Sequence, residues 1–291
     1  MEKIEQIAIM GMGLMGASLG AALKKSGFQG RVMGYARNET TVQQGLAKEW
    51  FDEATSSVEK AVANADLVVM SLPVRSIEPF FKAMQPHLKV GAIITDVGST
   101  KDEIESTILP LTRGSSSCFI GSHPICGSEK SGLEAAHEHL YDGHTCIICP
   151  NDDTSADALA KIRFLWTSIG MQISEMDARE HDKLLAATSH LPHLVATALV
   201  RAVLHQKSSP RSSFCGSGFE DTTRVAAGSA SLWTDIVLSN PESILNELEK
   251  MQQELSTIRT LVKEADQQGL YDWLQSGAAL RRALVDKREN G

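Results

Sequence analysis

A glycine-rich turn near the N-terminus is the feature that most restricts how this chain folds. The segment GMGLMG, residues 11–16, directly follows an apolar run and precedes a pattern with helical spacing. In such a strand–turn–helix unit the first glycine permits a tight turn, the second lets the backbone approach a pyrophosphate, and the third lets the helix pack on the strand. The expected dinucleotide-binding residues are Gly11, Gly13, Leu14, Met15 and Gly16. The alternative is a glycine-rich turn without a ligand.

The end of the second expected strand bears on which dinucleotide binds. The strand 31–35 is followed by Ala36 and Arg37. NAD-binding folds usually place an acidic residue here to hold the ribose 2′-hydroxyl, and Ala36 offers no acceptor. Arg37 could instead pair with a 2′-phosphate. The sequence therefore favours NADP, with NAD possible if Arg37 is a solvated loop residue.

Apolar runs rich in Val and Ile alternate with helix-period segments through about the first 175 residues. The runs lie at 6–10, 31–35, 67–72, 92–97, 118–121, 145–149 and 171–174. Continuous apolar strands separated by helices predict a mostly parallel sheet covered on both faces. We therefore expect an α/β fold, with an N-terminal Rossmann-type dinucleotide-binding domain at 1–175.

Beyond residue 175 only helical patterns continue, at 178–206 and 241–268. For the second pattern Asn240 is the expected N-cap, Pro241 the first helical residue and Gly269 the stop. The stretch 208–218 is rich in Ser, Gly and Pro and predicts a loop. We expect an all-helical substrate-binding and dimerisation domain at 176–291. Its extensive apolar faces favour a homodimer.

Composition excludes several partner classes. The chain has 28 basic and 36 acidic residues, a net charge of -8, and no Lys/Arg run, so nucleic acid is not an expected partner. No stretch approaches the ~20 apolar residues of a membrane span, and the start lacks the pattern of an export signal. The five cysteines fit a reducing compartment. We expect a cytoplasmic protein.

Two of the cysteines, Cys146 and Cys149, have the spacing CxxC. They fall within an expected buried strand, where positions three apart point to opposite faces. This arrangement favours packing over redox chemistry or half of a metal site.

Polar residues follow three of the expected strands, at the sheet edge where ligands of such folds bind. Ser71, Leu72 and Pro73 follow one strand and are expected to contact the dinucleotide, Ser99 follows the next, and His123 follows the third. A neutral imidazole can accept a hydroxyl proton as a hydride leaves. We then expect activity to rise with pH near the ordinary histidine pKa of ~6.5. The alternative is a structural or surface histidine.

Four stretches carry a family resemblance. GSHPICGSEKSG at 121–132, SHLPH at 189–193, GFEDTTR at 218–224 and Trp233 closely resemble the prephenate and arogenate dehydrogenases of tyrosine biosynthesis. The same order and the same long gaps extend the resemblance over nearly the whole chain. It implies oxidative decarboxylation of prephenate to 4-hydroxyphenylpyruvate, or of arogenate to tyrosine, and a homodimer built through the helical domain. Which of the two substrates is preferred stays open.

The resemblance also implies roles for single residues. His123 matches the catalytic histidine that hydrogen-bonds the ring hydroxyl, Ser99 the serine that helps to orient it, and Arg224 the arginine that holds the ring carboxylate. Further matches to residues that line or support the substrate pocket are His190, His193, Glu129, Asp221 and Trp233. Ala36 departs from the acidic residue of NAD-dependent members, which puts their cofactor choice in doubt here.

The residues themselves agree with these roles but leave alternatives. Arg224 offers a planar two-donor fork to a carboxylate, and its alternative is a surface arginine paired with Asp221. His190 and His193 lie three apart and share a helix face, and Pro192 between them should kink the helix and turn both rings toward a cleft. They could instead pack in a helical core. Two ligands without a neighbouring carboxylate or Cys do not favour zinc, so we expect no metal. Glu129 could lie in a solvated turn.

Two other functions fit part of the sequence. A β-hydroxyacid dehydrogenase has a similar glycine motif but depends on a catalytic lysine on the long helix after the sheet, where this chain has Lys183. A nucleotide-sensing binding protein without turnover would keep the glycine turn and would not need His123 together with Arg224.

Overall fold

The computed structural model describes residues 4–127, 130–204 and 210–289, and the chain forms two compact units, 1–243 and 244–291. The strands are β1 (Gln6–Met10), β2 (Arg31–Tyr35), β3 (Glu53–Thr55), β4 (Leu67–Met70), β5 (Ile93–Asp96), β6 (Cys118–Phe119), β7 (Gly121–Pro124), β8 (Thr145–Cys149) and β9 (Gln172–Glu175). The helices of the α/β region are α1 (Leu14–Lys25), α2 (Glu39–Ala47), α3 (Val58–Val62), α4 (Val74–Met84), η1 (Gln85–His87), α5 (Asp102–Thr112), η2 (Leu133–Ala135) and α6 (Ala156–Ser168).

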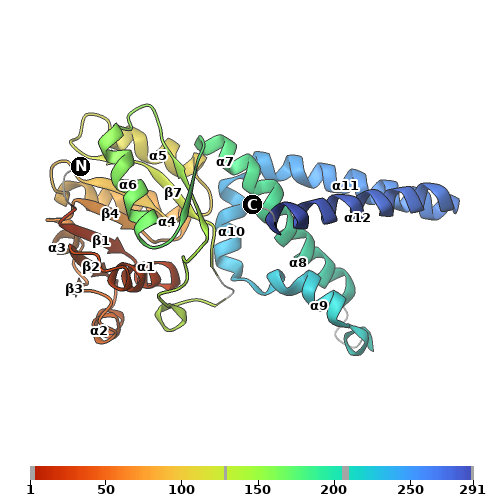
Figure 1. Cartoon of the computed structure of the whole chain (residues 1–291), viewed down its shortest axis with the longest axis horizontal. Helices are drawn as coiled ribbons and strands as arrows, with labels where there is room; N and C mark the ends of the chain where they lie inside the picture. The colour runs from red at the N-terminus through yellow and green to blue at the C-terminus, as the bar shows by residue number, and fades with distance from the viewer. Residues whose placement is uncertain (1–3, 128–129, 205–209, 290–291) are drawn as a thin grey trace. The chain divides into compact units, whose positions relative to one another are not determined.

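In the described part of the chain after β9, all the regular elements are helices. They are α7 (Ala178–Leu185), η3 (Ala186–His190), α8 (Leu191–Leu204), η4 (Pro210–Phe214), α9 (Ser217–Thr223), η5 (Arg224–Ala227), α10 (Ala230–Ser239), α11 (Pro241–Glu264) and α12 (Gln267–Glu289). The predicted fold class, a Rossmann-type α/β region followed by a largely helical one, is confirmed (Figure 1).

The main sheet has six strands in the order β3-β2-β1-β4-β5-β6, and every neighbouring pair is parallel. Its central strands are buried along their whole length, which explains their continuous apolar runs. The sequence did not predict β3. That strand has three residues, none of them buried, and so it gives no apolar signal.

Both faces of the main sheet are covered. Successive strand residues point to opposite faces, so Ile7 and Ile9 of β1 pack in one apolar cluster while Ala8 and Met10 pack in another. The first cluster includes residues of α1 and α6, and the second includes residues of α3, α4 and α5. The two clusters are the core that holds the carboxyl ends of the strands in place.

A second sheet extends from the edge of the first. In the order β7-β8-β9, β7 is antiparallel to β8 and β8 is parallel to β9. The single strand expected at 118–121 is therefore two short strands, β6 and β7. Cys146 and Cys149 on β8 are buried free thiols, as predicted, and burial raises the pKa of Cys149 to about 12.

The helical region departs from the sequence expectation in three places. A π-helical turn, η3, separates α7 from α8 and ends two residues before Pro192, so the backbone is wider near the point where proline removes a donor. Residues 210–214 and 217–218 are helical, so the predicted loop is wrong there. The predicted start at Pro241 is confirmed, but the stop at Gly269 is wrong. The chain turns at Ala265, which has a φ of 51°, and Gly269 lies in the first turn of α12.

In the second unit, α11 from residue 244 onward and α12 are tied by Trp273, whose indole N–H donates to Glu254 at 2.9 Å. Within the described part of this unit, Ile244 alone is fully buried. None of the helices described is both long enough and apolar enough for a membrane span.

Candidate active site

The glycine turn between β1 and α1 leaves no room for side chains at two of its positions. Gly11 has a φ of 112°, and a Cβ there would lie 2.3 Å from the backbone oxygen of Ser71. A Cβ at Gly16 would lie 1.9 Å from the backbone oxygen of Gly11. At Gly13, by contrast, a Cβ would meet no described atom within 4 Å, so backbone borders open space. A side chain at Gly13 would clash with no described atom but would fill this open space, which we call the cradle.

The start of α1 faces that cradle. Its N-cap, Gly13, supplies no side-chain hydrogen bond, and its first turn contains no acidic residue. The free backbone N–H groups and the positive end of the helix dipole are therefore available to an anion. Leu14 and Met15 form the half-buried first turn. These features fit the pyrophosphate of a dinucleotide.

The other expected cofactor residues lie around the same strand ends. Ser71 extends β4, and its backbone N–H donates to Met10 at 2.9 Å. Leu72 is half-buried and lies 3.3 Å from the Cβ position of Gly11, while Pro73 is the exposed N-cap of α4. Arg37 is exposed one residue after the buried Ala36.

His123 lies within β7 rather than in a loop after a strand. The hydrogen bond from the Ser122 backbone N–H to Asp96 Oδ1, at 3.2 Å, places it beside the carboxyl end of β5. The side chain is 9% exposed. Burial, with smaller electrostatic contributions from His181, Lys101 and His190, holds the pKa of His123 well below its usual range. The imidazole is therefore neutral at neutral pH, and the expected pH rise near 6.5 shifts to lower pH.

A buried ion pair between Lys101 and Asp96 holds the loop between β5 and α5 in place. Lys101 and Asp96 are 1% and 0% exposed, and the Lys101 ammonium contacts the Asp96 carboxylate. Asp96 Oδ2 also accepts from the Gly98 backbone N–H at 2.7 Å. The half-buried Ser99 lies in the loop that these bonds hold.

Two adjacent residues of α7 reach the same region, and the sequence motifs did not reveal them. His181 Nε2 lies 2.8 Å from His123 Nδ1, and His181 Nδ1 lies 2.7 Å from Asp182 Oδ1. Asp182 also accepts the backbone N–H groups of Lys101, at 2.7 Å, and Asp102, at 3.1 Å. The only available signal in the sequence was that His181 and Asp182 share one helical face with the apolar residues Ala178 and Leu185, and this face of α7 is buried.

His190 and His193 meet at a single aromatic side chain. The His193 ring stacks on Trp233 with centroids 3.5 Å apart, and the His190 ring meets it edge-on at 6.2 Å. Both histidines are buried. In the described part of the chain, neither ring nitrogen of His190 nor Nδ1 of His193 has a hydrogen-bond partner. Burial lowers the pKa of His190 to about 4 and also lowers that of His193.

The remaining predicted residues have mixed surroundings. Arg224 opens η5 and is exposed. It precedes Val225, whose backbone hydrogen-bonds the His193 ring, so η5 is tied to α8 at this point. Asp221 is exposed on α9. Glu129 lies outside the described residues.

Lys183, on which the β-hydroxyacid reading depends, is exposed, whereas its neighbours His181 and Asp182 are buried. Among the described residues, no cluster of three His, Cys, Asp or Glu side chains could hold a metal ion. The geometry thus favours neither a lysine-centred nor a metal-centred site.

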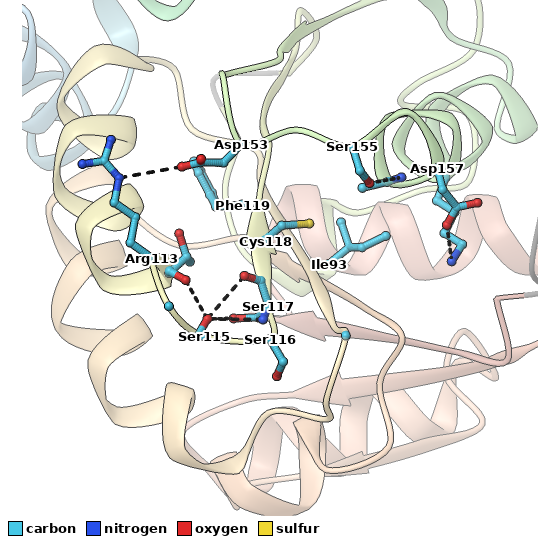
Figure 2. Close-up of a pocket in the computed structure, with 15 residues that line it drawn as sticks. Ile93, Arg113, Ser115, Ser116, Ser117, Cys118, Phe119, Asp153, Ser155 and Asp157 are labelled. Atoms are coloured by element: carbon cyan, nitrogen blue, oxygen red, sulfur yellow. Dashed lines mark hydrogen bonds and ion pairs between the residues drawn. The ribbon is translucent and has the colours of Figure 1, made fainter.

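A cavity of about 530 Å³ lies apart from these residues, beside the edge strand β6 (Figure 2). Its lining includes Ser115, Ser117 and Ser155, with Arg113 and Asp153 paired at 3.8 Å across one side. None of the predicted site residues lines it, so it is separate from the site built around His123.

A nucleotide-binding parallel sheet followed by a helical region is the architecture of a nicotinamide-dependent dehydrogenase. Comparison with known families narrows this class. The protein-family model described as prephenate dehydrogenase, nucleotide-binding domain, matches residues 19–175. A second family model, described as prephenate dehydrogenase, dimerization domain, matches residues 177–276. The chain belongs to the prephenate dehydrogenase family.

Individual relatives agree with this family. A cyclohexadienyl dehydrogenase of Zymomonas mobilis is 35% identical over 98% of this chain and 97% of its own length. Prephenate dehydrogenase from Aquifex aeolicus, solved with hydroxyphenyl propionate and NAD+, is 31% identical with a TM-score of 0.89, over 97% of this chain and 99% of that one. Synechocystis arogenate dehydrogenase is 29% identical with a TM-score of 0.82, over 96% and 99%.

Proposed function

We propose that this chain catalyses the NAD(P)-dependent oxidative decarboxylation of prephenate to 4-hydroxyphenylpyruvate in tyrosine biosynthesis. Arogenate, which would yield tyrosine at the same site, is the alternative. The observation that carries the proposal is the buried, neutral imidazole of His123 at the carboxyl end of a nucleotide-binding sheet. Relatives named for prephenate, arogenate and cyclohexadienyl substrates support it.

The proposed reaction begins at the hydroxyl of the substrate ring. His123 accepts the hydroxyl proton at Nε2 while Ser99 helps to orient the hydroxyl. A nicotinamide bound at the glycine-rich turn would supply the acceptor for the hydride that leaves the same carbon. The new carbonyl draws electrons from the opposite ring carbon, whose carboxylate leaves as carbon dioxide. The ring becomes aromatic, and its oxygen takes the proton back from His123. His123 therefore has to be neutral before the reaction, which its lowered pKa ensures.

We assign substrate binding to the helical side. Arg224 would hold the ring carboxylate with its planar fork, chiefly for positioning, because that charge disappears as the bond to carbon dioxide breaks. The unpaired nitrogens of His190 and His193, beside Trp233, would hydrogen-bond the substrate side chain. Asp221 and Glu129 would line or support this pocket.

For the cofactor, we propose NADP as the preferred dinucleotide. Arg37 is exposed two residues after β2, where it could reach a 2′-phosphate, and Ala36 offers no acceptor to a 2′-hydroxyl. The Aquifex aeolicus relative was solved with NAD+, so NAD is the alternative to test.

For the assembly, we propose a homodimer through the helical domain, which we place at 176–291 after a nucleotide-binding domain at 1–175. The family model for residues 177–276 is described as a dimerization domain. Large apolar side chains on α11 and α12 are exposed in the single chain, among them Leu255, Val262, Leu274 and Leu280. Sedimentation velocity should give a dimer, and a monomer at micromolar concentration would contradict this.

The proposed function is tested by a matrix of kcat/KM for prephenate and arogenate against NAD and NADP. We expect the highest value for prephenate with NADP. The variant Arg224→Ala should raise KM for the substrate about 10-fold or more with less change in kcat, because binding common to ground state and transition state is lost. Absence of turnover with all four pairs would refute the activity, and an unaltered KM in Arg224→Ala would remove Arg224 from the pocket.

A further inference from the structure

We propose that Asp182 and His181 are positioning residues that set the protonation pattern of His123, leaving the lone pair of His123 Nε2 free to accept a proton. This inference deepens the proposed function and rests on it for the identity of the proton donor. It names two residues outside the motifs that mark the family. The juxtaposition that carries it is a line of three side chains, Asp182, His181 and His123, joined by two hydrogen bonds.

The order of the bonds fixes where each proton lies. Carboxylate oxygen only accepts, so His181 Nδ1 has to carry a hydrogen to bond Asp182 Oδ1 at 2.7 Å. A neutral His181 then presents a lone pair at Nε2. Because that atom lies 2.8 Å from His123 Nδ1, the latter has to donate. A neutral His123 with its hydrogen on Nδ1 keeps its lone pair on Nε2. Among the described residues, Nε2 of His123 has no hydrogen-bond partner.

Asp182 is held firmly as an acceptor. Besides His181, its carboxylate accepts two backbone N–H groups at the start of α5, those of Lys101 and Asp102. These two N–H donors lie at the N-terminal end of α5 and hold both carboxylate oxygens of Asp182 in place. Its backbone carbonyl accepts from Asn240 Nδ2 at 2.7 Å, which fixes this turn of α7 from the other side. The position of Asp182 is therefore well defined.

The charges around His123 leave Asp182 as the available counterion. Lys101 is paired with Asp96 from β5 and the following loop, and His190 on η3 and His181 on α7 have lowered pKa values and are neutral. Cys146 on β8 has a pKa raised well above its usual range by burial, and is a neutral thiol. When His123 takes the hydroxyl proton, its positive charge arises where burial penalises it. His181 shares the Nδ1 proton, and Asp182 balances the charge.

We call the hydrogen-bonded line of Asp182, His181 and His123 the relay. A purely structural role for Asp182, as a cap on α5, predicts a different outcome from this relay. If Asp182 only caps α5, weakening its hydrogen bond to His181 should leave the position of the proton on His123 unchanged. The relay instead requires that changes at Asp182 or His181 alter the proton on His123. The protonation pattern of His123 in the resting protein is therefore the decisive observation.

The first experiment measures that pattern directly and needs no substrate. Full-length protein labelled with 15N-histidine is examined by NMR at pH 7.5, with the His123 signals assigned from a His123→Gln spectrum. We expect Nδ1 protonated and Nε2 unprotonated. In Asp182→Asn the amide can donate to His181 Nδ1, and we expect the pattern at His123 to reverse or become mixed. His123 protonated at Nε2 in the unmodified protein, or unchanged in Asp182→Asn, overturns the proposal.

The second experiment measures kcat and KM separately. His181→Leu removes the acceptor and should lower kcat by about 10² with little change in KM, as expected when a base loses its orienting partner. In His181→Gln the side-chain oxygen can still accept from His123, so we expect part of kcat to return. The matched control is His144→Gln, an exposed histidine. Equal kcat in His181→Leu and the unmodified protein overturns the relay.

The two experiments also separate this inference from the proposed function. If the chain turns over neither prephenate nor arogenate but His123 carries its proton on Nδ1, the activity is refuted and the relay stands. If turnover is as proposed and His123 carries its proton on Nε2, the relay fails alone. Should Asp182→Asn not fold, the spectrum of the unmodified protein and the kinetics of His181→Gln still decide.

Discussion

The histidines on the two sides of the proposed site differ in how their polar atoms are satisfied. Around His123, the buried side chains of Asp96, Lys101, His181 and Asp182 have partners within the chain, whereas Thr100 Oγ1 and Glu105 Oε2 of the same region have none among the described residues. Around Trp233, both ring nitrogens of His190 and Nδ1 of His193 lack partners in the described structure. Buried polar groups without partners are costly, commonly about 1–3 kcal/mol each.

The difference separates the two tasks of an enzyme. A base has to be oriented before the substrate arrives, so its partners belong to the protein. A recognition surface has to leave donors and acceptors for the ligand, and this chain does so on α8 and η3. We therefore interpret the β7 side as built for the chemical step and the Trp233 side as built for binding. Each of the following predictions tests one side of that comparison.

The largest effect is expected from His123→Asn. The amide cannot act as a base, so kcat should fall by about 10²–10⁴ with only a modest change in KM. Initial rates of reduced-cofactor formation across substrate concentrations give both constants. Undiminished turnover would show that His123 is not the proton acceptor.

On the same side, Lys101→Met should strongly destabilise the fold. The substitution leaves the Asp96 carboxylate, 0% exposed, without its counterion, and removing one partner of a buried pair commonly costs about 3–5 kcal/mol. Urea denaturation followed by circular dichroism measures the loss. The control Lys60→Met changes an exposed lysine of α3 and should stay within about 0.5 kcal/mol. Equal stability of the two variants would contradict the partnered state of this region.

On the Trp233 side, a substitution should raise the free energy of unfolding instead of lowering it. His190→Leu replaces an imidazole that has two unpaired buried nitrogens with an apolar side chain, so the free energy of unfolding should rise by about 1–3 kcal/mol. At the same time KM for the substrate should rise. The control His87→Leu changes an exposed histidine of η1. A variant that is less stable and binds substrate normally would show that His190 belongs to the packing alone.

The most gradual effect is a loss of stability in acid, to which both sides contribute. His123, His181, His190 and His193 all have pKa values below the usual histidine value. Between those values and ~6.5 the unfolded chain binds protons that the folded chain does not, so stability is present above pH 6.5 and is lost as pH falls. Each histidine contributes up to about 1.4 kcal/mol per pH unit, and for His190 the loss continues to about pH 4.

Urea unfolding at pH 7.5, 6.0 and 5.0 checks this, and His190→Leu should show a shallower pH dependence than the unmodified chain. A stability that is constant from pH 7.5 to 5.0 would contradict the lowered pKa values.

Local patterns predicted most of the elements correctly. The strands at 6–10, 31–35 and 145–149 have the expected bounds because each is a continuous apolar run buried in a sheet. The turn of GMGLMG could be predicted because its backbone geometry leaves no room for a side chain at Gly11 or Gly16. The stop expected at Gly269 failed because glycine also fits the first turn of a helix, here after the capping side chain of Asp266.

Contacts between distant segments could not be predicted in this way. His123 and His181 are 58 positions apart, and Asp182 caps a helix that begins 80 positions earlier. Neither separation has a periodicity or a motif that the chain could display locally. The sequence alone determined the α/β order and the glycine-rich turn after β1, because these depend on residue type and near neighbours. Only the tertiary structure decided which nitrogen of His123 is left free, because hydrogen bonds act over about 3 Å and their partners meet only after the chain has folded.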